Sequence, residues 1–316
     1  MPGIVSLLPS ATEWVCALGL DADLRGVTFE CDHPRGVARG RAVVVQGLPT
    51  AGLEPGAIDA LVRERLAAGE PLYTLDTAAL AAIAPDVVLT QDLCAVCALP
   101  ADAAREACAA VGDPTTVVTL DPHTLAEVLD GATAVADACG VVARGELLRR
   151  DLQGRLDAVE DAVRGRDRPR VLVLEWTDPP FVAGHWVPDL VAAAGAQPVL
   201  AAPGARSTAT TWDDVARAGA DAVLVAPCGY GLADARRQAA AVLDQLPAGT
   251  AVWAIDAGAV VTRPGPRVVD AVEALAAAWH PGAGAGRPDL VALVRPGGGD
   301  TTTTGMPDVI AYAPPT

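Results

Sequence analysis

The stretch from Leu125 to about Arg164 limits the fold most, because it lacks strand signals while the chain on both sides alternates short apolar runs with helical segments. Apolar residues in it recur at helical spacing between charged residues, which predicts helix. The alternation on either side predicts parallel sheets covered by helices. The sequence therefore predicts an α/β protein with a first lobe at 1–124, a connector at 125–168, a second lobe at 169–281 and a flexible tail at 282–316. The connector is either two helices in series or one long helix.

Short β-branched runs mark the expected strands. They fall at 4–8, 27–29, 43–45, 72–75, 86–90 and 116–120 in the first lobe, and at 171–174, 221–226 and 251–255 in the second. Helices are expected between them, the first of them capped by Ser10 or Thr12. Beyond His280 the chain is rich in Gly, Pro and Thr, so residues 300–305 are expected to be disordered.

The loop at 174–195 concentrates aromatic side chains. Two of the 6 Trp, one of the 2 Phe and one of the 4 His lie there, in a chain whose aromatic content is only 3%. Ligands of α/β proteins bind where loops leave the carboxyl ends of parallel strands. Two interpretations stay open: a hydrophobic plug at the end of the sheet, or a wall that contacts a ligand. The candidate wall residues are Trp176, Phe181, Trp186 and, from a later helix start, Trp212.

Charge and targeting signals narrow the class of function. The chain has 23 Lys and Arg against 39 Asp and Glu, a formal charge of −16, which disfavours binding to nucleic acid or anionic lipid. No window approaches the roughly 20 apolar residues of a membrane span, and the start of the chain shows no signal-peptide pattern. The 7 Cys are odd in number and show no disulfide framework. We therefore expect a cytoplasmic protein.

Four cysteines at predicted strand exits are candidate metal ligands: Cys31, Cys94, Cys97 and Cys228. The C-x-x-C pair suits Zn²⁺, an iron–sulfur cluster or thiol redox chemistry, and an ordinary buried loop is the alternative. Four soft ligands would close a structural site, whereas three would leave a position for an exogenous ligand. A Cys–His hydrolase built on Cys31 or Cys228 is a further alternative, although the sequence has no P-loop, G-x-S-x-G or H-E-x-x-H motif.

Several segments resemble the helical-backbone (class III) substrate-binding proteins that feed cobalamin and iron-chelate ABC importers. Residues 5–13, V-S-L-L-P-S-A-T-E, resemble the opening of that family, and residues 83–89, I-A-P-D-V-V-L, its "L-x-P-D-L-V" strand. Residues 179–184, P-P-F-V-A-G, resemble a loop of the cobalamin-binding member, and residues 263–267 match the close of the second lobe. The resemblance covers about residues 4–281. It implies two Rossmann-like lobes, a long connecting helix, little hinge motion and a ligand cleft between the lobes.

The resemblance makes a cobalamin-like corrinoid the expected ligand, followed by other bulky metal chelates. A helix N-terminus can hold a polar group, an imidazole can ligate a corrin cobalt, and an arginine can meet a carboxylate. His123, beside a proline at a helix boundary, is expected to be a cap rather than a ligand. The polar candidates are Ser10, Thr12, Glu13, Asp32, His33, Glu175, His185 and Arg263.

The sequence thus predicts a cytoplasmic protein that holds or hands over a corrinoid and catalyses no reaction, although a thiol-dependent activity stays open. The alternative is a metal-centred protein that uses the four cysteines for Zn²⁺ or an iron–sulfur cluster. A third hypothesis is the substrate-binding component of an ABC importer. The expected partners are a small molecule and either an ABC permease or a corrinoid-handling protein.

Overall fold

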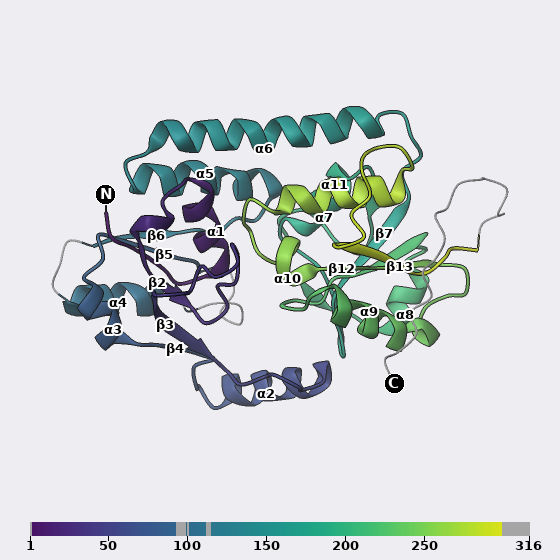
Figure 1. The fold of residues 1–316 in the computed structure, drawn as a ribbon. Coiled ribbons are helices and arrows are strands. Elements are labelled where there is room, and N and C mark those ends of the chain that lie inside the picture. The colour runs from purple at the N-terminus through teal and green to yellow at the C-terminus, as the bar shows by residue number, and fades with distance from the viewer. Residues whose placement is uncertain (1, 93–98, 100, 112–114, 299–316) are drawn as a thin grey trace, which may run out of the picture.

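The computed structural model describes residues 2–92, 99, 101–111 and 115–298, and it shows two sheets in two lobes (Figure 1). The sheet of the first lobe has the strand order β4-β3-β2-β1-β5-β6, and only β4 runs antiparallel to its neighbour. The parallel sheet predicted for this half is confirmed for the other strands. Its strands are β1 (Ile4–Ser6), β2 (Leu24–Thr28), β3 (Ala42–Gly47), β4 (Tyr73–Leu75), β5 (Val87–Thr90) and β6 (Thr116–Thr119).

Helices follow most strands of the first lobe. The first one begins at Pro9, with Leu8 in extended conformation at its N-cap, so Ser10 and Thr12 lie inside the helix and their predicted capping role is wrong. Proline suits this position because its missing N–H would have no partner there. The helices are α1 (Pro9–Ala17), the 3₁₀ turn η1 (Asp21–Asp23), α2 (Pro55–Ala67), α3 (Thr77–Ile83) and α4 (Ala101–Val111).

The connector contains two helices, α5 (Leu125–Ala138) and α6 (Val142–Val163). The chain reverses between them at Gly140, which has a φ of 71° that glycine adopts without strain. Gly145 lets the pair pack closely, because a Cβ there would lie 2.5 Å from the Cβ of Ala136. Helix α6 runs along the top of both lobes, so the predicted long connecting helix is present as the second of the two (Figure 1).

The second lobe holds a mixed sheet in the order β10-β8-β7-β11-β12-β13, with β9 also paired to β7. Strands β7, β11 and β12 are mutually parallel, while β8, β10 and β13 run antiparallel to their neighbours. The strands are β7 (Arg170–Thr177), β8 (Pro180–Val182), β9 (Gln197–Pro198), β10 (Thr208–Ala209), β11 (Ala222–Val225), β12 (Ala251–Ile255) and β13 (Val291–Arg295). The helices are α7 (Val187–Ala193), α8 (Trp212–Arg217), α9 (Leu232–Ala241), the 3₁₀ turn η2 (Leu243–Gln245), α10 (Ala257–Val260) and α11 (Val268–Trp279).

Strand β13 corrects the prediction that residues 282–316 are a flexible tail. Residues 291–295 pair antiparallel with β12 and extend the sheet of the second lobe. Leu290 and Val291 are buried, so this apolar run stabilises an edge strand inside a segment that composition alone assigns to a tail. The segment 300–305 lies outside the described residues.

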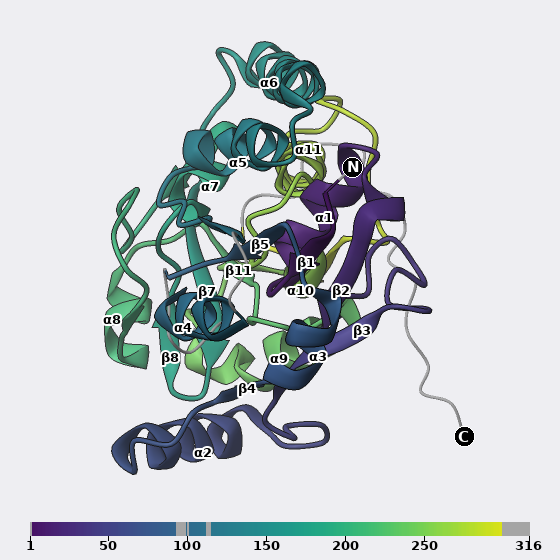
Figure 2. The same cartoon turned by 90° about the vertical axis from the view of Figure 1, so that its left-hand side faces the viewer.

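One apolar core joins the two lobes. It contains Ile4 and Leu89 from the first sheet, Val173 and Leu224 from the second, and the inner faces of α5, α6, α7 and α11 between them. Each lobe has a second core on its other face. Seen from the side, α5, α6 and α11 stack above the sheets while α2 lies below them (Figure 2). Because close-packed interiors resist shear, this shared core favours the small hinge motion that the resemblance implies.

Among the described residues, no helix combines the length and the apolar composition needed to cross a bilayer.

Candidate ligand site between the lobes

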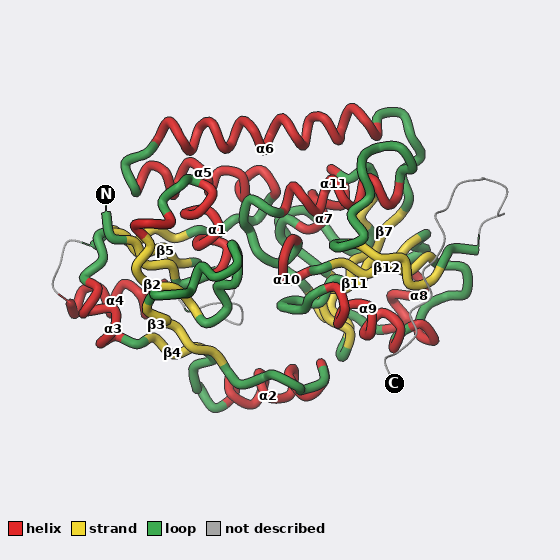
Figure 3. Tube along the Cα trace, viewed as in Figure 1, coloured by secondary structure: helices red, strands yellow, loops and turns green. Residues whose placement is uncertain are grey.

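Loops at the carboxyl ends of the strands meet where the two lobes face each other (Figure 3). Asp32, which follows β2, forms an ion pair of 2.5 Å with Arg263, which follows β12 and α10. His123, which follows β6, lies beside His185, which follows β8, with ring centres 6.0 Å apart. Ligands of α/β folds bind at such carboxyl ends. The inter-lobe seam, as we use the term, comprises residues 28–33, 54–56, 120–125, 175–186, 226–231 and 261–267.

An ion cluster closes one part of the inter-lobe seam. The carboxylate of Glu13 accepts two hydrogen bonds from Arg267, at 2.9 Å from Nε and 2.5 Å from NH2, and lies 3.7 Å from Arg263. Only 1% of the Glu13 side chain is exposed. Glu13 and Arg263, both predicted to contact a ligand, therefore contact residues of the opposite lobe here, while Asp32 keeps 68% of its side chain exposed.

The first turns of α1 surround Cys31. Ser10 and Thr12 are buried, and the Thr12 hydroxyl lies 3.1 Å from the sulfur of Cys31. The backbone N–H of Thr28 donates to the same sulfur at 3.3 Å. Burial raises the pKa of the Cys31 thiol, and the hydrogen bonds from Thr12 and Thr28 lower it by less. Cys31 is therefore an enclosed thiol whose raised pKa does not favour the thiolate that a nucleophile needs.

An aromatic pair lies on the second-lobe side of the inter-lobe seam. The rings of Trp176 and Tyr230 are 5.9 Å apart and tilted by 51°, and both side chains are half-buried. The Trp176 indole N–H donates to the carbonyl oxygen of Asp178 at 3.0 Å, which fixes the ring. Burial raises the pKa of Tyr230, as do the charges of Asp234 and Glu54. Because Glu54 belongs to the first lobe, its charge acts on Tyr230 from across the inter-lobe seam.

Helix α2 reaches the second lobe at its first turn. A Cβ added at Gly56 would lie 2.4 Å from a carboxylate oxygen of Asp178, so the glycine allows this close contact. No residue of α2 is fully buried, although Ile58, Leu61 and Val62 are half-buried on one face. In Figure 1 the helix lies beneath the lobes, on the side opposite α6. Asp178, two residues after Trp176, and the start of α2 therefore approach each other from different lobes.

Two of the predicted wall residues belong to the core instead. Trp186 is only 5% exposed, and its indole N–H donates to the carbonyl oxygen of Val261 at 2.8 Å. Trp212 begins α8 and packs against the second core of its own lobe. Phe181 is half-buried on β8, paired in register with Trp176. The plug interpretation therefore holds for Trp186, whereas Trp176 is half-buried and its contact with a ligand stays a prediction.

Two histidines of the inter-lobe seam have lowered pKa values. For His33 the cause is burial, followed by the charge of Arg267. For His185 the causes are burial, then His123, then Arg206. Sequence reasoning did not identify His123 or Tyr230 as site residues, and their positions directly after β6 and β11 were the only available signal. Glu175 is half-buried, and its carbonyl oxygen accepts from the N–H of Cys228 at 3.0 Å.

The proposed cysteine ligands do not assemble within the described residues. Cys228 is exposed and Cys31 buried, both as free thiols, while Cys94 and Cys97 lie outside the described residues. In the same part of the chain, no group of three or more His, Cys, Asp or Glu is arranged to hold a metal ion. Burial raises the pKa of Cys139 to about 11, in keeping with a core position.

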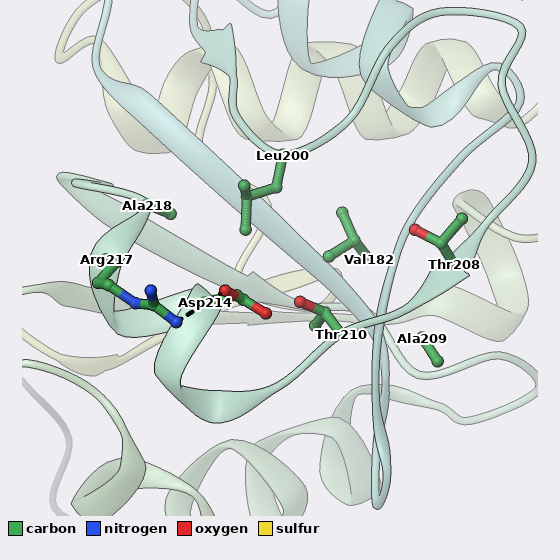
Figure 4. A pocket seen from close by; sticks show the side chains of 8 residues that line it. All are labelled: Val182, Leu200, Thr208, Ala209, Thr210, Asp214, Arg217 and Ala218. Atoms are coloured by element: carbon green, nitrogen blue, oxygen red, sulfur yellow. Dashed lines mark hydrogen bonds and ion pairs between the residues drawn. The ribbon is translucent and has the colours of Figure 1, made fainter.

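Two surface pockets are lined only by residues of the second lobe and of the end of the connector. One, of about 360 Å³, contains Val182, Leu200 and the ion pair between Asp214 and Arg217, at 2.9 Å (Figure 4). The other, of about 520 Å³, is lined by residues that include Arg166 and Asp221. Their linings contain no residue of the first lobe, so neither pocket is the site that the meeting of the lobes creates.

Two α/β lobes that share a helical layer and meet at the carboxyl ends of their strands define a helical-backbone binding protein. Residues 64–266 match the model of the periplasmic binding protein family, and the chain belongs to that family. Its members are binding proteins rather than enzymes. Comparison with curated protein sequences gives no match.

Solved structures share this fold at low identity. A periplasmic heme-binding protein from Pseudomonas aeruginosa is 22% identical with a TM-score of 0.64, over 96% of this chain and 100% of that one. The apo form of the periplasmic heme-binding protein RhuT from Roseiflexus sp. RS-1 is 20% identical with a TM-score of 0.60, over 89% of this chain and 98% of that one. The periplasmic vitamin B12-binding protein BtuF of Vibrio cholerae is 19% identical with a TM-score of 0.60, over 87% of this chain and 95% of that one. These similarities establish the fold.

Proposed function

We propose that the protein binds a bulky, planar metal chelate between its lobes, a cobalamin-like corrinoid first and haem second. The observation that carries the proposal is the Trp176–Tyr230 pair of the second lobe, whose Trp176 donates to the backbone of Asp178, the residue that approaches the start of α2 on the first lobe. Half-buried aromatic rings supply flat apolar contact area, which a macrocycle needs for stacking. Solved relatives with this fold are described as heme-binding and vitamin B12-binding, which supports the same ligand class.

In this proposal the protein holds or hands over its ligand and does not transform it. The described cysteines are free, which agrees with the predicted cytoplasmic location, where thiols stay reduced. The partner is then a corrinoid-handling protein. An ABC permease is the alternative partner, because one relative of this fold is described as an ABC transporter substrate-binding protein. Fractionation of cells that express the full gene tests the location directly.

The ligand is tested by titrating the protein with cyanocobalamin and with haemin while tryptophan fluorescence and ligand absorption are followed. Replacing either ring, in Trp176→Ala or Tyr230→Ala, should weaken binding at least about tenfold, since buried aromatic anchors dominate binding energy. Trp176→Phe, which keeps an aromatic face, should lose less. Leu147→Ala, at a position 61% exposed on α6, is the control and should bind as the unmodified protein does.

Unchanged affinity in both alanine variants would remove the aromatic pair from the site. Failure of both tetrapyrroles to bind the unmodified protein would refute the proposed ligand class.

A further inference from the structure

His123 and His185 come from opposite lobes, yet their rings lie together. The ring centres are 6.0 Å apart and the ring planes are tilted by 48°. His123 is exposed and His185 half-buried, so the pair is open to solvent. Neither histidine is explained by the packing of the core. The backbone at each position shows how the pair is held.

The backbone of His185 is held in a conformation that side chains rarely adopt. Its φ is 53°, in the left-handed region, which costs a non-glycine residue on the order of 1 kcal/mol. Two hydrogen bonds maintain it: the His185 N–H donates to the oxygen of Ala205 at 2.6 Å, and the Gly204 N–H donates to the oxygen of His185 at 3.1 Å. The surrounding loop therefore fixes the backbone from which the imidazole projects.

The backbone of His123 is equally well defined. Its N–H donates to a carboxylate oxygen of Glu127 at 2.6 Å, and Thr124 and Glu127 form a capping box at the start of α5. The next residue but one, Leu125, donates its N–H to the carboxylate of Asp189 on α7 at 3.0 Å. This hydrogen bond crosses between the lobes. The backbone positions of the two histidines are therefore set by the folded structure before any ion binds.

The ring nitrogens of the pair are available for coordination. In the described part of the chain, no hydrogen bond joins a ring nitrogen of His123 or His185 to another protein group. Imidazole nitrogen binds Zn²⁺ at about 2.0–2.1 Å, so two imidazoles on one ion have ring centres roughly 5 to 6.5 Å apart, for angles from tetrahedral to linear. The observed 6.0 Å falls in this range without movement of the lobes.

Charged side chains near the histidine pair both oppose and favour a bound cation. The positive charge of Arg206 acts on the His185 ring, and it opposes a bound cation. The carboxylates of Glu127 and Asp189, bonded to backbone N–H groups of the same segment, offset that charge.

We infer that His123 and His185 form a preformed two-imidazole site for a divalent transition-metal ion between the lobes. Imidazole selects ions such as Zn²⁺, Ni²⁺, Co²⁺ and Cu²⁺ over Mg²⁺ and Ca²⁺. The protein supplies two ligands, and water or a donor atom of a bound molecule completes the coordination. The inference does not depend on the proposed tetrapyrrole, because the ion alone is expected to bind.

The test is titration of the full-length, chelator-treated protein with Ni²⁺ by calorimetry and with Co²⁺ by visible absorption, without tetrapyrrole. We expect one ion per chain, a cobalt spectrum without a sulfur charge-transfer band, and at least about tenfold weaker binding in His123→Gln and in His185→Gln. His280→Gln, at a buried histidine outside the inter-lobe seam, should leave the affinity unchanged. Arg206→Gln should increase it, because a repelling charge is removed.

A sulfur charge-transfer band that persists in both histidine variants would assign the ion to thiols and overturn the inference. Absence of ion binding, or loss in only one of the two variants, would overturn it as well. Cyanocobalamin and haemin titrations of the same variants keep the two proposals distinguishable, since tetrapyrrole binding without ion binding refutes only the histidine site.

Discussion

Arg267 holds the carboxylate of Glu13 with two hydrogen bonds, of 2.9 and 2.5 Å, and so joins α1 of the first lobe to the start of α11 in the second. The Glu13 side chain is 1% exposed and that of Arg267 18% exposed. Removing one partner of a buried pair leaves the other charge without compensation in a medium that solvates it poorly.

Glu13→Gln should therefore lower the free energy of unfolding by about 3 to 5 kcal/mol. Urea denaturation followed by circular dichroism measures this. Asp161→Asn is the matched control, because its pair with Arg164 is exposed and should be worth less than about 1 kcal/mol. Equal losses in the two variants would show that the buried pair does not join the lobes energetically.

Gly184→Ala should destabilise the loop that carries His185. A Cβ at this position would lie 2.4 Å from the oxygen of Ala205 and from the nitrogen of Ser207, both of them backbone atoms. Because backbone cannot move aside as a side-chain end can, we expect a loss of about 1 to 3 kcal/mol in the free energy of unfolding. The comparison is Gly154→Ala on α6, where no atom lies within 4 Å and alanine should stabilise by about 0.5 to 1 kcal/mol. Losses of the same sign in both would contradict the steric argument.

Trp186→Ala should lower stability rather than only weaken ligand binding. The side chain is 5% exposed within the shared core, and truncating a buried tryptophan typically costs about 3 to 5 kcal/mol. Trp176→Ala, at the half-buried neighbour on β7, should lose clearly less stability and more ligand affinity. Urea denaturation and ligand titration on both variants measure the contrast. An exchange of these two behaviours would place Trp186, not Trp176, in the ligand site.

Acid should destabilise the protein before its carboxylates are protonated. Burial is the first cause of the lowered pKa values of His33, His185 and His280. The unfolded chain, with histidine pKa values near about 6.5, therefore binds more protons than the folded one as the pH falls through that value. The free energy of unfolding should decrease from about pH 7.5 to 5.5. His280→Gln should flatten this slope, and a slope that stays the same would exclude His280 as a contributor.

Much of the fold could be predicted from the sequence because its strands are short, buried and rich in Val. The strands at 86–90 and 171–174 and the helices after them were found at nearly their true positions. Strand β13 was missed since glycine and proline around it dominate the local composition, while its pairing with β12 is a long-range effect. The start of α1 is predicted at Ser10 or Thr12 rather than at Pro9, because Ser and Thr are typical N-cap residues, although neither caps this helix.

The candidate site was harder to predict, since sequence separates residues that the fold brings together. Trp176 and Trp186 have similar surroundings in the sequence, yet one is half-buried and the other packs in the core. His123 is expected to be a cap, but Thr124 caps α5 in the structure, and nothing local indicates that the His123 ring lies beside His185. Glu13 was identified, although its partner Arg267 is 254 positions away in the chain.

The shared apolar core has a consequence for folding. It runs from the first sheet through α5, α6, α7 and α11 to the second sheet. The helices α5, α6, α7 and α11 cover apolar surface of both lobes. A fragment that ends before α5 would therefore expose an apolar face of the first lobe to water. The two lobes thus form a single cooperative folding unit rather than two autonomous domains, and calorimetry should record one unfolding transition instead of two.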